Sequence, residues 1–144
     1  MMRGNFMTAD QAAALVKDGM TVCPIGMTLV GASEAVLKAI EKSFLETGHP
    51  AGITLLHSCG QSDRKDGIQH LAHEGLVKRI VGSHWGLQPR WMELISRDQV
   101  EAYCLPQGQI AQLYRSMACG LPGKMSKVGL GTFVDPRLEG GKMN

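Results

Sequence analysis

The stretch E-A-Y-C-L-P-Q-G-Q-I-A-Q-L-Y-R, residues 101–115, contains both periodicities on which the fold depends. The apolar run 100–105 predicts a β-strand. Apolar residues at helical spacing follow it: Ile110, Leu113, Tyr114 and Met117. A proline, Gln107 and Gly108 stand between the two elements. Gln107 can only donate and accept hydrogen bonds, so this strand-to-helix corner can hold an oxygen atom but cannot attack one.

The same alternation of strands and helices runs through the rest of the chain. Further strands are expected at residues 21–25, 53–57 and 79–83, and one more extended segment at 127–134. Four further helices are expected, of which the first runs from a capping box at Thr8 and Gln11 through Val16, and the last begins at Pro89 and carries Trp91, Leu94 and Ile95. The second is capped by Ser33, is ended by Gly48 and Pro50, and has an apolar stripe of Val36, Leu37, Ile40, Phe44 and Leu45. The third is marked by the apolar residues Ile68, Leu71, Ala72 and Leu76. This order predicts an open, mostly parallel α/β sheet with helices on both faces.

Ligands of such sheets bind beyond the carboxyl ends of the strands. Four loops of the predicted fold meet at this edge: residues 26–31, 58–60, 83–86 and 106–108. The sequence therefore predicts that Gln107 lies at the mouth of a parallel sheet.

Composition narrows the class of protein. The 144 residues predict a single domain, residues 1–144, and the net charge of +2 with no basic run argues against a nucleic-acid partner. No segment is apolar for long enough to span a membrane, and residues 1–10 lack the apolar core of a signal peptide. The four cysteines, Cys23, Cys59, Cys104 and Cys119, are widely spaced and contain no C-x-x-C pair, which favours buried, reduced thiols in the cytoplasm.

Two side-chain groups could in principle carry chemistry. His70, His73 and Glu74 could ligate a metal ion from one helix face, but their spacing is not H-E-x-x-H, and hydrogen-bonded histidines are the favoured interpretation. Cys59 with His57 could form a nucleophilic pair, and a buried structural thiol is the favoured alternative. We therefore predict no metal site and no cysteine nucleophile.

Two further features are open to a binding interpretation. The loop G-M-T-L-V-G, residues 26–31, could present backbone N–H groups to an anion, but it is neither G-x-G-x-x-G nor a Walker loop, and a plain β–α loop is favoured. Trp85 and Trp91 could cover a ligand, although packing at the sheet edge is the commoner role of aromatic residues at that spacing.

Three segments together resemble one family: L-A-H-E-G-L-V-K-R-I-V-G-S-H-W-G at 71–86, residues 101–115 quoted above, and K-V-G-L-G-T-F-V-D-P-R-L-E-G-G-K-M-N at 127–144. They are similar to the family I coenzyme A transferases, above all to the amino-terminal, alpha-type part of fused acetate, propionate or acetoacetate CoA-transferases. The resemblance covers residues 8–144. It implies the open α/β sheet of that family, which is related to sugar-phosphate isomerases.

The resemblance also implies a reaction. Family members move CoA between an acyl-CoA and a free short-chain carboxylate by ping-pong kinetics, in short-chain fatty acid and ketone body metabolism. A glutamate attacks the thioester and becomes a mixed anhydride and then a glutamyl-CoA thioester. CoA is a substrate, and no permanently bound cofactor is implied.

The matching motifs imply the site residues. Gln107 and Gly108 would line the acyl site, and Gly31 belongs to the glycine loop of the family's site, although the loop sequence here departs from the family's glycine- and proline-rich turn. The nucleophilic glutamate lies in the second half of family members, so no catalytic residue is expected in this chain. Glu34, Glu74, Glu93, Glu101 and Glu139 do not match that position.

The chain is therefore expected to be a truncated amino-terminal domain that works with a carboxy-terminal half or a second subunit. The alternatives are a non-catalytic module that binds an acyl-CoA or an organic acid, a truncated remnant, and a structural interaction protein. An incomplete sheet would expose an edge and apolar faces, so we also expect a homo-oligomer.

Overall fold

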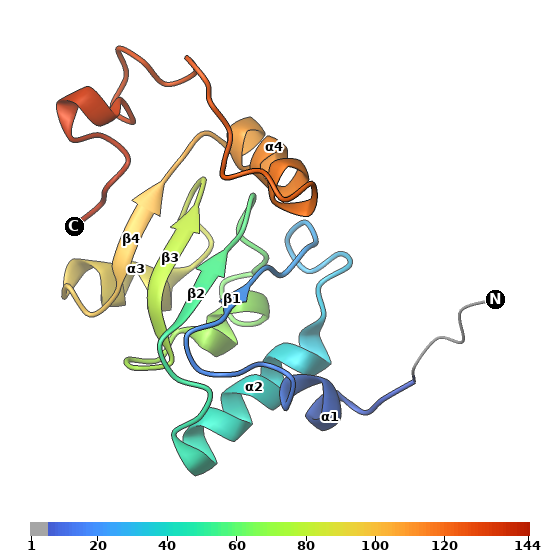
Figure 1. The fold of residues 1–144 in the computed structure, drawn as a ribbon. Coiled ribbons are helices and arrows are strands. Elements are labelled where there is room, and N and C mark those ends of the chain that lie inside the picture. Colours follow the sequence, from blue (N-terminus) through green and yellow to red (C-terminus); the bar gives the residue numbers. More distant parts are fainter. Residues whose placement is uncertain (1–5) are drawn as a thin grey trace.

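The computed structural model describes residues 6–144 and contains a four-stranded parallel sheet (Figure 1). The strands are β1 (Thr21–Val22), β2 (Ile53–Leu56), β3 (Val77–Gly82) and β4 (Glu101–Cys104), and they lie in the order β1-β2-β3-β4. Every neighbouring pair is parallel. The expected open α/β sheet is confirmed.

The helical elements alternate with the strands. They are α1 (Ala9–Ala13), α2 (Glu34–Thr47), the 3₁₀ helix η1 (Gly67–Leu71), α3 (Pro89–Ser96), α4 (Gln107–Ala118) and the 3₁₀ helix η2 (Pro136–Leu138). Within residues 6–144 no helix has the length and hydropathy needed to cross a bilayer.

The helices are distributed unevenly around the sheet. Leu55, Ile80 and Ala102 are in register across β2, β3 and β4 and are fully buried. They belong to one cluster with buried residues of α2, η1 and α3: Leu37, Ile40, Ile68, Leu71, Trp91 and Ile95. Helix α4 lies instead across the carboxyl ends of the strands (Figure 1). The core is thus built by the connecting helices, and α4 stands at the edge where a ligand is expected.

The helix boundaries follow the expected signals in most places. Thr8 caps α1 and forms the complete capping box with Gln11. Gly48 ends α2 in the left-handed region, at a φ of 76°, which glycine adopts without strain. Pro89 occupies the first turn of α3. Ser33 stands at the cap of α2 but its side chain makes no capping hydrogen bond, so that expectation was only half right.

Several expected elements were wrong in extent. Residues 127–134 contain turns in place of an extended strand, because glycines at positive φ repeatedly reverse the chain there. The helix expected at 68–76 is only the short η1, and Leu76 precedes β3 directly. The first strand stops after Val22, two residues before Pro24, which has no N–H to donate to a ladder. Leu45 and Met117 are exposed and do not belong to the apolar stripes.

The last residues of the chain pack along β4. Cys104 donates its backbone N–H to the Gly141 carbonyl at 2.6 Å, and Met143 donates to the Ala102 carbonyl at 2.8 Å. The Asn144 side chain accepts a hydrogen bond from Ala102 N and donates two, to the carbonyls of Ile95 and Val100. These contacts hold the segment after α4 close to the end of β4.

Candidate functional site

Hydrogen bonds link the loops at the carboxyl edge of the sheet from β1 to β4. After β2, the Cys59 thiol donates to the Gly26 carbonyl at 3.0 Å, and the Gln61 amide donates to the Pro24 carbonyl at 3.1 Å. These two contacts join the β2 loop to the β1 loop.

The remaining links continue to the P-Q-G corner. The Ser83 hydroxyl after β3 donates to the Ser58 carbonyl. Leu105 at the end of β4 donates its N–H to the Gly82 carbonyl at 2.8 Å. Hydrogen bonds therefore join the first three of the predicted edge loops, and the bond from Leu105 to Gly82 places the fourth loop, residues 106–108, beside them.

The P-Q-G corner offers hydrogen-bond donors that the protein does not use. Gln107 and Gly108 are the first two residues of α4, and both are exposed. The first helical bonds run from Gln109 and Ile110 back to the Pro106 carbonyl. In residues 6–144 neither N–H of Gln107 and Gly108, nor the Gln107 amide, has a hydrogen-bond partner. Such a helix start attracts a carboxylate or an oxyanion.

The glycine loop after β1 is organised differently. Met27 and Val30 exchange two backbone hydrogen bonds, at 3.0 and 2.9 Å, so these N–H groups are not free to hold an anion. A Cβ on Gly26 would lie 2.9 Å from the Val30 oxygen, so glycine is required there. Gly31 is exposed, at a φ of 75°. The favoured interpretation as a closed β–α loop agrees with this geometry.

Gly31 and Gln107 occupy different parts of the edge. In Figure 1 the loop after β1 lies near the carboxy-terminal half of α4, whereas the P-Q-G corner adjoins β4. Burial, together with the nearby Cys23 thiol, raises the pKa of Tyr114, which stands in that half of α4. The two glycine-bearing segments thus share an edge without making a common cradle.

His57 is a buried histidine beneath this edge. Its Nδ1 accepts the Gly60 N–H at 3.0 Å, which leaves the proton of the neutral ring on Nε2. Burial lowers the pKa of His57 to about 4, and the nearby charge of His84 acts in the same direction. The ring stands edge-on to Trp85 with centroids 5.0 Å apart.

The Cys59 thiol donates to the Gly26 carbonyl, so the structure does not pair it with His57 as a nucleophile. The expectation of buried thiols was wrong for three of the four cysteines, since Cys59 is half-buried and Cys23 and Cys119 are exposed.

Other buried polar atoms lie near His57. His57 Nε2, Trp85 Nε1 and both amide atoms of Gln88 have no hydrogen-bond partner among the described residues. Gln88 fills the space above Gly60, where any Cβ would collide with it. A buried polar group without a partner lowers the free energy of unfolding by about 1–3 kcal/mol. The carboxyl edge therefore contains groups that destabilise the folded state.

The three metal-ligand candidates do not converge. His70 and His73 both contact Glu41, at 2.6 and 2.7 Å, while Glu74 accepts a hydrogen bond from Gln99. A different trio, Glu34, Asp66 and His70, has its ligand atoms within 4.8 Å of one another. The Lys38 ammonium already forms ion pairs with Glu34 and Asp66, at 3.1 and 3.6 Å. The arrangement is an ion-pair network between α2 and η1.

The two tryptophans pack in the core, as favoured. Trp91 is fully buried and its indole N–H donates to the Ile68 carbonyl at 3.0 Å. Trp85 is 5% exposed.

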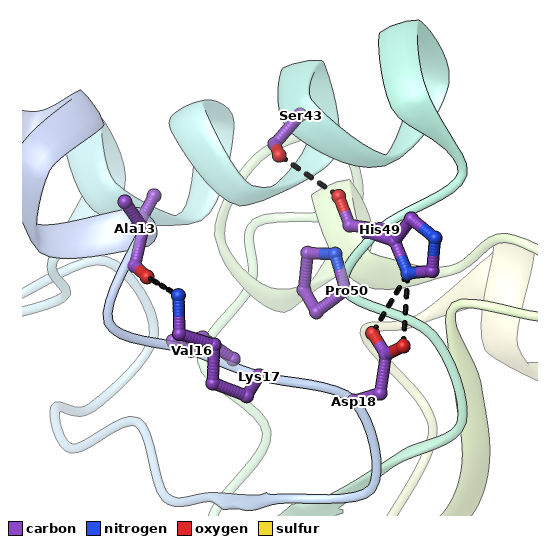
Figure 2. A pocket seen from close by; sticks show the side chains of 8 residues that line it. Ala13, Val16, Lys17, Asp18, Ser43, His49 and Pro50 are labelled. Carbon is purple, nitrogen blue, oxygen red and sulfur yellow. Dashed lines mark hydrogen bonds and ion pairs between the residues drawn. The ribbon is translucent and has the colours of Figure 1, made fainter.

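A depression of about 470 Å³ lies near α1 and the loop after α2, away from the carboxyl edge (Figure 2). Its polar groups contact each other. His49 Nδ1 lies 2.9 Å from an Asp18 carboxylate oxygen, and the Ser43 hydroxyl donates to the His49 carbonyl at 2.8 Å. The pocket has little unused hydrogen-bonding capacity, so it is not our candidate site.

A second hollow, which we name the corner groove, lies beside the P-Q-G corner. It measures about 260 Å³ and lies between residues 105–113 and residues 124–136. Its lining is mostly apolar: Leu105, Pro106, Gln109, Leu113, Lys124, Ser126, Val128, Leu130, Val134 and Pro136. Gly129 lets the second wall fold closely on itself, because a Cβ there would lie 2.8 Å from the Val134 side chain.

Sequence reasoning missed His57, Gln88 and the corner groove as features of the edge. The sequence suggested His57 as a partner for Cys59, not as a buried histidine beneath the edge. A signal was present, since a histidine and a glutamine flank two of the predicted edge loops. The groove has no local signal, because residues 124–136 form it only after the chain has turned back onto α4.

Comparisons with known proteins identify the family. A family model described as "Coenzyme A transferase" matches residues 6–143. The caffeate CoA-transferase of Acetobacterium woodii is 46% identical over 140 residues, which cover 96% of this chain and 27% of that protein. The acetate CoA-transferase subunit alpha of Escherichia coli K12 is 26% identical and is covered to 58% of its length.

A solved structure shows the same fold. The acyl-CoA transferase YdiF of Escherichia coli O157:H7, described as a thioester complex with CoA, superposes with a TM-score of 0.91 at 36% identity, over 96% of this chain and 29% of that chain. The chain thus spans about a quarter of the length of these first relatives. On this evidence, the chain belongs to the coenzyme A transferase family.

Proposed function

We propose that this chain is a single amino-terminal domain of an acyl-CoA:carboxylate CoA-transferase and forms one wall of its acyl site. The observation that carries the proposal is the set of unused donors at the P-Q-G corner, at the carboxyl edge of a parallel sheet. The relatives named above transfer CoA to acetate or caffeate by their names, which supports a carboxylic acid as acceptor.

The corner fits the oxyanion of an acyl transfer. When a carboxylate attacks a thioester carbonyl, the carbonyl oxygen gains negative charge before the CoA thiolate leaves. The Gln107 amide and the backbone N–H groups of Gln107 and Gly108 are donors of the required kind, and the start of α4 adds a favourable dipole. In the proposed reaction these groups orient the acyl group and stabilise the oxyanion.

The nucleophile comes from another part of the enzyme. A glutamate outside this chain would form the mixed anhydride, which releases the free acid when the CoA thiolate attacks the glutamyl carbonyl. A second carboxylate then attacks the glutamyl-CoA thioester and forms a new mixed anhydride. The CoA thiolate attacks the acyl carbonyl of this anhydride, which gives the new acyl-CoA and restores the glutamate. The partner that supplies this glutamate is a carboxy-terminal half or a second subunit, and short-chain acids such as acetate, propionate and acetoacetate are the proposed substrates.

Exposed apolar residues are consistent with such a partner. Ile25, Met27 and Val30 in the β1 loop are 67–74% exposed, and Met125 and Phe133 are 97% and 80% exposed. Exposed apolar side chains of this kind are typical of surfaces that another chain covers. Such surfaces would also support the homo-oligomer that the sequence predicts.

The test is CoA exchange from acetyl-CoA to propionate, with this chain alone and with the carboxy-terminal part of a related enzyme added. We expect exchange only in the mixture. Gln107→Ala should lower kcat by about 10²–10³-fold, the usual loss when one oxyanion donor is removed. Gln112→Ala, on the exposed side of the same helix, is the matched control and should leave kcat unchanged.

Three results would count against the proposal. Exchange by the chain alone would show that the nucleophile lies within it. Equal rates for the Gln107 and Gln112 variants would remove the corner from the site. Binding of an acyl-CoA with no turnover in any mixture would favour the alternative, a non-catalytic binding module.

A further inference from the structure

We propose that His70 is a doubly protonated imidazolium in the folded chain and forms a proton-controlled contact between α2 and residues 61–70, the segment that contains η1. We name its bonds to Glu34 and Glu41 the His70 contact. The inference does not depend on the proposed function. It is carried by the partners of the two ring nitrogens, by the charges around the ring and by the hydrogen bonds that lead from η1 to the carboxyl edge.

Both nitrogens of the His70 ring face a carboxylate of α2. Nδ1 lies 2.6 Å from a Glu41 oxygen, and Nε2 lies 2.7 Å from a Glu34 oxygen. A carboxylate only accepts hydrogen bonds, and a neutral imidazole has a single N–H, so a neutral ring could satisfy only one of these two contacts. Two protons on the ring satisfy both. The His70 side chain is 12% exposed, which leaves water little access to either nitrogen.

Glu34 does not supply the second proton, because both of its oxygens have other donors. The Lys38 ammonium lies 3.1 Å from Oε1, and the Gly67 backbone N–H donates to Oε2 at 2.9 Å. Burial raises the pKa of Glu34, but hydrogen bonds from Lys38 and His70 outweigh burial, and the net pKa is lowered. Glu34 is therefore charged, and the proton between it and the ring belongs to His70.

Glu41 is kept charged by cations and donors on its other oxygen. Its Oε1 lies 2.7 Å from Nε2 of His73 and 3.6 Å from the guanidinium of Arg90 on α3. His73 meets this carboxylate through one nitrogen, so a neutral ring is sufficient there. Because Arg90 is always protonated, Glu41 keeps a positive neighbour at every pH at which the chain is folded.

The charges around the His70 ring leave room for one more cation. The charged groups that α2, η1 and α3 turn toward this cluster are the carboxylates of Glu34, Glu41 and Asp66 and the cations of Lys38 and Arg90. Three negative charges thus meet two positive ones. A protonated His70 makes the cluster neutral, whereas a neutral ring would leave one partly buried carboxylate without compensation.

Hydrogen bonds continue from η1 to the carboxyl edge. Ile68 donates its N–H to the Gln61 carbonyl at 2.8 Å, and Gly67 packs so closely on this carbonyl that a Cβ would overlap it. The buried Gln61 amide donates in turn to the carbonyls of Pro24 and Gly26, at 3.1 and 3.3 Å. A contact that holds η1 on α2 therefore also fixes the loops after β1 and β2.

The first test counts the protons on the ring. NMR of the chain labelled with ¹⁵N-histidine distinguishes a ring nitrogen that carries a proton from a bare one. At about pH 7.5 an unperturbed histidine is mostly neutral, and we expect both nitrogens of His70 to be protonated in the folded chain. The same chain unfolded in urea is the control and should show one bare nitrogen on each ring. A bare nitrogen on His70 in the folded chain would overturn the proposal.

The second test follows hydrogen exchange of the Ile68 amide, which reports whether η1 stays bonded to Gln61. Glu34→Gln removes one of the two carboxylates, so His70 should show a bare nitrogen and Ile68 should exchange at least about tenfold faster. Glu46→Gln removes the same charge from an exposed position of α2 and is the matched control. It should change neither readout. Equal exchange of Ile68 in the two variants would contradict the His70 contact.

The third test uses the wild-type chain alone, so it does not depend on how well a variant folds. As the pH is raised, protection of the Ile68 amide, corrected for the intrinsic exchange rate, should fall at the pH at which His70 loses its second proton. The Leu105 amide, which bonds to Gly82, is the reference and should keep its protection. Loss of the ring proton with unchanged protection of Ile68 would show that the proton does not control the contact.

Discussion

The two ends of the sheet each contain a histidine, in opposite surroundings. Near α1, His49 is 68% exposed and lies 2.9 Å from the Asp18 carboxylate. At the carboxyl edge, His57 is fully buried, and its Nε2 has no partner among the described residues. The His49 ring is paired with Asp18, whereas the buried Nε2 of His57 lacks a partner within the described part of the chain and lowers the free energy of unfolding. Regions that are expensive to maintain tend to be functional ones, so the comparison favours the carboxyl edge as the site.

The largest expected effect on stability comes from a substitution that crowds the His57 ring. Gly82 lies against the His57 ring, and a Cβ there would overlap it. Gly82→Ala should therefore lower the free energy of unfolding by about 3 kcal/mol through overpacking. Gly86→Ala, in the loop that follows, has open space around its Cβ and should change it by less than about 0.5 kcal/mol. Urea denaturation measures both, and equal losses would contradict the crowding at His57.

A smaller effect concerns the charge of His57. Its pKa is lowered from 6.5 to about 4 by burial, so the unfolded chain binds the proton more readily than the folded one. Stability should therefore fall as the pH falls through this window, by about 2 kcal/mol between about pH 7 and about pH 5. His57→Gln should remove this dependence, as measured by denaturation at each pH.

His49→Gln is the control for that experiment, since His49 is exposed at the other end of the sheet. It should keep the dependence on pH between those two values. If the His57 variant loses stability on acidification as steeply as the wild type, the buried neutral histidine is not its cause.

The smallest effect concerns the ion-pair network between α2 and η1. Burial raises the pKa of Glu41, but hydrogen bonds from His73 and His70 outweigh burial, and the net pKa is lowered from 4.5. A depressed carboxylate pKa contributes stability above the unfolded value that is lost as the pH falls through the folded one. Glu41→Gln should therefore flatten the loss of stability below pH 4.5.

The matched control for Glu41 is Glu46→Gln on the same helix. Glu46 is exposed and has no hydrogen bond or ion pair with residues 6–144. Thermal unfolding followed between about pH 5 and about pH 3 compares the two variants. An equal slope in both would mean that the histidines do not hold Glu41 in its charged form.

Much of the fold could be predicted because its signals are local. The strand at 53–56 and the helix from Pro89 are marked by apolar spacing and by a proline at the first turn. Gly48 ends α2 because it adopts a left-handed conformation that residues with a side chain rarely adopt. Such signals act within a few residues and need no knowledge of the tertiary structure.

The errors occur where distant parts of the chain decide the outcome. Residues 127–134 have the aliphatic residues of a strand, but they turn at Gly129 and Gly131 and line the corner groove opposite Leu105 and Leu113. In the same way, nothing near His70 in the sequence indicates that Glu34 and Glu41 on α2 occupy its two ring nitrogens. The sequence predicted the strand-to-helix corner at Gln107. It did not predict that the hydrogen-bond donors of this corner have no partner within residues 6–144.

The strand order has a consequence for how the chain acquires its structure during synthesis. Each strand pairs with the one that precedes it in sequence, so pairing never has to wait for a segment that is still to be translated. Low sequence separation between partners reduces the entropy lost on closing each loop and favours fast folding. The sheet can grow strand by strand as the ribosome releases it, and the Asn144 side chain, which bonds to Ala102, Ile95 and Val100, would fasten β4 only after all four strands have been made.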